Sequence, residues 1–175
     1  MFYSYRVTSK MERIVIFIDN SNIFKGFQKF KIKADYEKLK NLIARHRKLE
    51  GIFLYEGAIY PLSPQKSNWY EELKNRSGYI IKITFDKIIT GGAIEKKVDI
   101  NIALDIISLA YENAYDIAIL VSGDGDFVPV ISKIKELGKT VEVWAFKYSL
   151  ANALSEVVGP QNIFYLDDII EDLKI

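Results

Sequence analysis

Residues 116–127 read Asp-Ile-Ala-Ile-Leu-Val-Ser-Gly-Asp-Gly-Asp-Phe, an apolar run that ends abruptly in glycines and acids. Continuous apolar runs of this length are typical of strands buried on both faces, as in a parallel sheet covered by helices. Gly123 and Gly125 flank Asp124, which allows a tight turn and the close approach of another backbone. The stretch therefore predicts a central strand followed by an acidic loop.

A second run of the same kind, Arg13-Ile-Val-Ile-Phe-Ile18, ends in Asp19. Between and beyond these two runs, strand patterns alternate with helical ones. We expect strands at 13–18, 51–60, 79–85, 116–121, 140–146 and 162–166. We expect helices at 35–49, 65–76, 97–113, 127–137 and 150–158 and a short one at the C-terminus, with 90–92 as a chain break. The alternation predicts an α/β fold, a doubly wound and mainly parallel sheet of five to six strands flanked by helices.

The chain has no internal repeat and no Pro/Gly/Ser-rich linker. We expect one domain at 13–175, preceded by a tail or extra edge element at 1–12. No run approaches the roughly 18 apolar residues of a membrane helix, and the first residues lack the apolar core of a signal peptide. A cytoplasmic location without membrane contact is the resulting expectation.

The amino-acid composition excludes several kinds of catalytic and metal-binding site. There is no cysteine, which excludes disulfides, thiolate nucleophiles and cysteine-bound metals. The single histidine, His46, lies between two arginines and is expected at the surface. The 24 basic and 23 acidic residues give a net charge of +1, so any contact with nucleic acid must come from local patches.

One such patch follows the first strand, where lysines alternate with phenylalanines. Basic and aromatic residues together suit single-stranded nucleic acid, through phosphate contacts and base stacking. The alternative is a helix with phenylalanines in the core and lysines in solvent, and we favour it for Phe24 and Phe27. The residues of the patch are Phe24, Lys25, Phe27, Lys29, Phe30, Lys31 and Lys33.

The acids carry the functional signal. Asp19, Asp124 and Asp126 each follow a predicted buried strand, and Asp99 falls in the first turn of the predicted helix at 97–113. In open α/β sheets the functional crevice lies beyond the carboxyl ends of the strands, where strand order reverses. These acids converge there if the first and fourth strands are neighbours.

Carboxylates gathered in one crevice repel each other unless a cation compensates them. Without cysteine or a usable histidine, oxygen ligands favour Mg²⁺ or Mn²⁺ over zinc. Structural alternatives exist for each acid. Asp126 could cap the next helix, Asp19 could be a turn residue, and Asp99 could be a helix-start charge favoured by the macrodipole.

Three stretches, Ile16–Ile23, Lys96–Ile100 and Val121–Pro129, resemble in order and spacing the signature motifs of NYN domains of the LabA-like (DUF88) branch. The resemblance runs from about Arg13 to Asp168. It implies a PIN-like fold and a divalent-metal-dependent nuclease acting on RNA, with DNA not excluded. Such domains often form homodimers, and here the tail residues Phe2–Tyr5 could take part.

By the same resemblance, the carboxylates that bind metal and act in catalysis would be Asp19, Asp99, Asp124 and Asp126. Asn22, Ser122 and Lys96 match the polar positions that would hold a water or phosphate. The chain departs from the pattern at Gly159–Asn162, where an aspartate is common, and at Lys97, where glycine is common. Neither departure removes a core ligand.

Two other classes stay open: a catalytically silent nucleic-acid-binding or regulatory module, and a phosphotransfer α/β domain. A haloacid-dehalogenase phosphatase needs a second aspartate two positions after the nucleophile, where this chain has Ser21. A receiver domain would use an aspartate after its third strand, such as Asp86, but also an acidic pair that is missing near Asp19.

Overall fold

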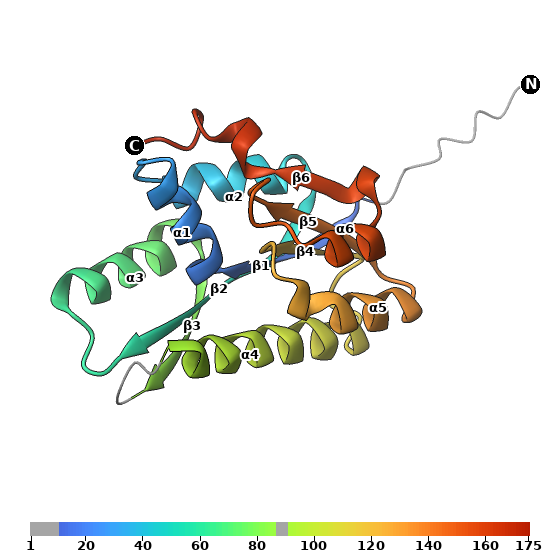
Figure 1. Cartoon of the computed structure of the whole chain (residues 1–175), viewed down its shortest axis with the longest axis horizontal. Helices are drawn as coiled ribbons and strands as arrows, with labels where there is room; N and C mark the ends of the chain where they lie inside the picture. The colour runs from blue at the N-terminus through green and yellow to red at the C-terminus, as the bar shows by residue number, and fades with distance from the viewer. Residues whose placement is uncertain (1–10, 87–90) are drawn as a thin grey trace, which may run out of the picture.

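The computed structural model describes the backbone of residues 11–86 and 91–175 and the side chains of residues 11–85 and 96–175. Its centre is a six-stranded sheet in which every neighbouring pair is parallel, in the order β3-β2-β1-β4-β5-β6 (Figure 1). The strands are β1 (Arg13–Asp19), β2 (Lys48–Ile59), β3 (Ile80–Asp86), β4 (Ile117–Val121), β5 (Thr140–Ala145) and β6 (Ile163–Tyr165).

Helices cover both faces of the sheet. One core cluster joins the first three helices and the C-terminal segment to the sheet, and a second joins the last three helices to the opposite face (Figure 1). The helices are α1 (Asn20–Lys29), α2 (Tyr36–Ala44), α3 (Pro64–Ser77), α4 (Gly91–Tyr111), α5 (Val128–Glu136) and α6 (Asn152–Val158). Single 3₁₀ turns are η1 (Gly125–Phe127), η2 (Pro160–Asn162) and η3 (Leu166–Ile169). The doubly wound α/β fold expected from the sequence is confirmed.

The two apolar runs form the middle of the sheet. All five residues of β4 are buried, as are six of the seven residues of β1, so both strands have helices on each face. After β1 the chain continues to β2 and β3 on one side of the sheet, and after β4 it continues to β5 and β6 on the other side. The strand order therefore reverses between β1 and β4.

Three element predictions were wrong in part. The expected helix at 35–49 ends at Ala44 because Arg45 adopts a left-handed φ of 54°, and Lys48 already pairs with Arg13 in the sheet. The predicted break at 90–92 is wrong because α4 begins at Gly91. Helix α1 was not among the expected elements, although the phenylalanine and lysine spacing after β1 was considered helical.

Within α1, Phe27 is buried as favoured, whereas Phe24 is 50% exposed, so the core assignment of Phe24 was wrong. His46 is exposed, as expected. Among the helices that the structure describes, none is long and apolar enough to cross a bilayer. The tail at 1–12 falls almost wholly outside the described residues, and the domain boundary after it stays a prediction.

Candidate metal centre and catalytic pocket

The carboxyl ends of β1 and β4 lie side by side, since Ile18 pairs with Val121 at the last step of their ladder. Asp19 is the final residue of β1, and Ser122 is the first residue beyond β4. The sheet therefore delivers the first acidic motif and the acidic loop to one place, at the reversal of strand order, where open α/β sheets bind ligands.

Asp19 is only 3% exposed and serves as the N-cap of α1. One carboxylate oxygen accepts the Asn22 backbone N–H at 3.2 Å and the Ser21 hydroxyl at 2.9 Å. The other accepts the Ser122 hydroxyl at 3.0 Å. Three donors therefore hold one buried carboxylate in a fixed orientation at the start of a helix.

Ser122 and Asn22 connect the acidic loop to α1. Ser122 is fully buried, and its oxygen also accepts the backbone N–H of Asp124 at 3.3 Å. The Asn22 side-chain oxygen accepts the backbone N–H of Gly123 at 3.3 Å. Both side chains thus make contacts within the protein that determine where Asp124 lies relative to Asp19.

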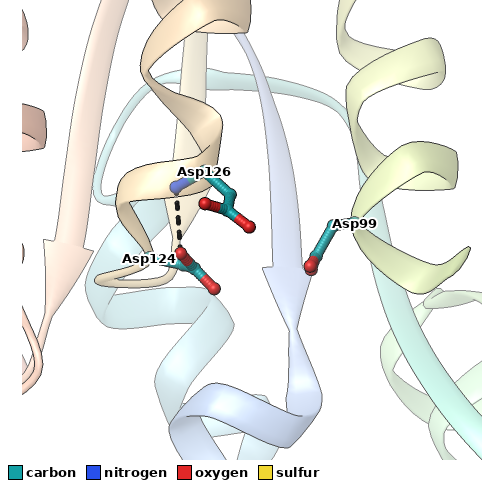
Figure 2. Close-up of side chains that lie close together, drawn as sticks. All are labelled: Asp99, Asp124 and Asp126. Carbon is teal, nitrogen blue, oxygen red and sulfur yellow. Dashed lines mark hydrogen bonds between the residues drawn. The ribbon is translucent and has the colours of Figure 1, made fainter. Parts of the chain in front are cut away.

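Asp124, Asp126 and Asp99 form a close group of acids (Figure 2). One carboxylate oxygen from each lies within 4.8 Å of those of the other two, a spacing that could hold a metal ion. Asp99 projects from α4 toward the loop that carries the other two, and the Asp126 backbone N–H donates to the Asp124 carboxylate at 2.9 Å (Figure 2). Asp99 and Asp124 are partly buried, whereas Asp126 is exposed.

Two of the structural alternatives can now be settled. Because α4 begins at Gly91, Asp99 lies in the third turn of the helix, so the predicted first-turn position was wrong and a macrodipole charge does not explain it. Asp124, not Asp126, is the N-cap of η1, and no side chain caps α5. The capping role considered for Asp126 therefore falls to Asp124.

One pocket of about 170 Å³ collects these groups. Of the predicted site residues, only Ser122 does not line it, because Ser122 lies buried beneath. Ser21 and Lys25 line it as well, and sequence reasoning did not place them there. Once α1 is known to start at Asn20, positions 21, 22 and 25 fall on one helix face. The lining consists of Asp19, Ser21, Asn22, Lys25, Lys96, Asp99, Asp124 and Asp126.

Electrostatics in the pocket favour a bound cation. Burial raises the pKa of Asp19 above its ordinary value, against the lowering by its three hydrogen bonds, and the neighbouring Asp124 carboxylate raises it further. The donor set at the Asp99–Asp124–Asp126 group is carboxylate oxygen alone, which matches the preference of Mg²⁺ and Mn²⁺. The residues present therefore fit a hard divalent ion.

The Asp19→Asn variant is expected to be more stable than the wild type when both are metal-free. The pKa of Asp19 is higher in the folded state than in the unfolded state. The free energy of unfolding therefore falls as the pH rises from the unfolded-state pKa to the folded-state pKa. At neutral pH the wild type buries an ionised carboxylate, and the uncharged amide of asparagine removes the cost of burying that charge. We expect a gain on the order of 1 kcal/mol, about 2–4 °C in melting temperature.

The same gain should vanish below about pH 3, where the carboxyl is protonated in both the folded and the unfolded state. Melting curves in EDTA at pH 7 and at about pH 3 measure the gain and its loss, with the exposed Asp172→Asn as the matched control. A melting temperature that falls at pH 7 would show that the hydrogen bonds of Asp19 outweigh its burial.

The fold and pocket together define an α/β domain with an acidic centre at the reversal of strand order. The NYN domain family matches residues 13–163, and the chain belongs to this family. NYN domains are part of the PIN-like nuclease superfamily. No match was found among curated proteins.

Among solved structures, a protein of unknown function from Vibrio parahaemolyticus is similar, with a TM-score of 0.77 and 23% sequence identity. The alignment covers 92% of this chain and 96% of that one. At this identity the likeness supports the fold.

Proposed function

We propose that this protein is a divalent-metal-dependent nuclease that cleaves phosphodiester bonds in RNA. The convergence of Asp99, Asp124 and Asp126 carries the proposal, because their ligand oxygens lie within 4.8 Å although α4 and the acidic loop are distant in sequence. Membership of a family in the PIN-like nuclease superfamily supports the same chemistry. Mg²⁺ or Mn²⁺ is the proposed cofactor.

Each group has a proposed role that follows from its place. Asp99 and Asp124, partly buried and facing one another, would bind the ion. Asp126 is exposed at the rim, where it could complete the ligand set or take the proton from an attacking water. A cation bound there would activate water and neutralise charge developing on the phosphate.

The remaining groups would position the metal ligands and bind the substrate. Asp19, held by Ser21, Ser122 and the Asn22 backbone, would orient the acidic loop and the ligands around the ion. Lys25 and Lys96 line the same pocket and would attract the phosphate backbone of the substrate. A phosphotransfer mechanism through Asp86 is disfavoured because β3 is the edge strand, two strands away from β1.

Cleavage of end-labelled single-stranded RNA and DNA, with Mn²⁺, Mg²⁺ or EDTA, tests the proposal. We expect RNA to be cut with either metal and to stay intact in EDTA. Intact RNA in the presence of metal and folded protein would contradict nuclease activity and favour the binding or regulatory alternative. Equal cleavage of DNA would contradict the assignment to RNA.

Metal binding has an independent readout in thermal stability. An ion that binds only the folded state raises its stability in proportion to the logarithm of ion concentration, by about 2.7 kcal/mol at a hundredfold excess over Kd. We expect Mn²⁺ to raise the melting temperature of the wild type and of Asp172→Asn. Asp99→Asn should lose most of this shift, since it removes one ligand charge. An unchanged shift in Asp99→Asn would exclude Asp99 as a ligand.

A further inference from the structure

A second depression of about 360 Å³ lies between α1 and α3, outside the acidic pocket. Its volume falls in the lower range of small-ligand sites, roughly 300–1,000 Å³. Four aromatic side chains line it, together with polar and charged groups from α1, β2 and α3. We call it the α1–α3 groove and describe it by Asn20, Phe24, Phe27, Tyr36, Glu56 and Trp69.

Several residues that line the α1–α3 groove belong to one connected hydrogen-bond network. The Tyr36 hydroxyl donates to the Asn20 side-chain oxygen at 2.5 Å, and the Asn20 amide donates to Glu56 at 3.0 Å. Glu56 also accepts the Tyr70 hydroxyl at 2.6 Å and pairs with Lys66. A carboxylate offers about four acceptor positions, and these donors fill three. Glu56 can therefore accept one further donor from a ligand.

The aromatic walls are held in place by packing. Trp69 and Tyr36 meet edge to face with ring centroids 5.2 Å apart, and Phe27 packs on Tyr36 at 6.2 Å. Phe24 differs from them, because its side chain is 50% exposed on the groove wall. An exposed ring beside fixed aromatics offers a stacking surface for a flat ligand.

The α1–α3 groove and the acidic pocket share helix α1. Ser21, Asn22 and Lys25 face the pocket, whereas Asn20 and Phe24 face the groove. Both sites also lie at the carboxyl edge of the sheet, since Asp19 pairs with Tyr55 and Glu56 follows directly. Lys33 and Lys66 line the groove, and Lys25 lines the pocket beyond it, so cationic groups accompany both sites. A polyanionic strand can therefore run from one site to the other.

We propose that the α1–α3 groove binds one unpaired nucleobase of the strand whose phosphate occupies the acidic pocket, an inference that rests on the proposed function. The base stacks on Phe24, and its polar edge donates to Glu56. Base-on-aromatic stacking is a common device of single-strand recognition. A base in this groove cannot be paired, so the groove selects single-stranded over duplex substrate.

Binding of a fluorescein-labelled single-stranded RNA oligonucleotide, measured by anisotropy in EDTA, tests the groove without cleavage. Phe24→Ala should weaken binding on the order of tenfold, whereas Phe24→Tyr, which keeps the ring, should bind as the wild type does. Tyr111→Ala is the matched control, because Tyr111 is exposed at the far end of α4. Melting curves check the fold of each variant, and alanine is the better helix former at position 24.

An abasic scan of the same oligonucleotide locates the base. One abasic position should weaken wild-type binding about as much as Phe24→Ala does, and should have no further effect in Phe24→Ala. The perfectly paired duplex should bind more weakly than the single strand. Wild-type affinity in Phe24→Ala, or preference for the duplex, would overturn the proposal.

The two proposals fail in different ways. Phe24-dependent binding without metal-dependent cleavage would keep the groove and reject the nuclease. Cleavage together with Phe24-independent binding would keep the nuclease and reject the groove.

Discussion

Asp124→Asn is expected to abolish metal-dependent RNA cleavage, with a rate at least about a hundredfold below that of the wild type. Metal-ion catalysis contributes several kcal/mol of transition-state stabilisation, and each 1.36 kcal/mol changes the rate tenfold. Asp124 belongs to the group of three carboxylates within 4.8 Å and lines the pocket with Asp19. Removing the charge of Asp124 should therefore weaken the binding of the metal ion on which cleavage depends.

The choice of asparagine separates chemistry from folding. The Asp124 side chain also accepts the Asp126 backbone N–H as the N-cap of η1, and loss of a cap costs about 1 kcal/mol. Asparagine keeps an acceptor there, whereas Asp124→Ala removes both cap and charge. We expect both variants to be inactive and only the alanine variant to melt lower. Single-turnover rates near the wild-type value in Asp124→Asn would remove Asp124 from the reaction.

The central strands were predictable because their signal is local. A run such as Ile117–Val121 is buried on both faces, so every residue in it is apolar and no helical period interferes. The acids just beyond the two runs converge for the same reason, since parallel neighbouring strands end at one edge. The sequence predicted this convergence only on the condition that β1 and β4 are neighbours. The observed strand order meets that condition.

Element boundaries were harder to predict where local signals point the wrong way. Gly91 and Gly92 indicate a break, yet α4 starts there, which moves Asp99 from the first turn to the third. The start of β2 at Lys48 is polar and follows the helical pattern of α2 without a glycine or proline between them. This segment is a strand because it pairs with β1, and the residues of β1 are distant from it in the sequence.

Parts of the candidate site could not be predicted because they depend on tertiary contacts. Ser122 follows a strand next to acids, which suits a ligand-binding hydroxyl, but it is fully buried and donates to Asp19. The network from Asn20 through Glu56 to Lys66 joins three elements and has no sequence motif. Exposure of Phe24 likewise depends on how α1 lies against α3, not on the spacing of phenylalanines.

Gly123→Ala is expected to destabilise the fold and to slow cleavage at the same time. A Cβ at position 123 would lie 2.4 Å from the backbone oxygen of Ser149 and 2.7 Å from its carbonyl carbon, distances that real Cβ atoms do not adopt. The Ser149 backbone is itself tied, because its N–H donates to the Phe146 carbonyl at 3.0 Å. The acidic loop must therefore move, and overpacking of this kind costs about 1–3 kcal/mol.

Movement of this loop reaches the acids directly. The Gly123 N–H donates to Asn22, and its carbonyl accepts the Ala151 N–H at 2.9 Å, so both bonds are strained when the loop shifts. Displacement of reacting groups by about 1 Å can lower a rate a hundredfold. We therefore expect cleavage to fall at least about tenfold even at temperatures where the variant is folded.

Gly125→Ala is the matched control within the same loop. Its added Cβ would meet only the Ala151 Cβ at 3.2 Å, a contact that a small shift relieves. Chemical denaturation and single-turnover cleavage of the two variants, measured side by side, should give a large loss for position 123 and a small one for position 125. Equal losses at both positions would mean that general loop stiffness, and not the close approach to Ser149, explains the requirement for glycine before Asp124.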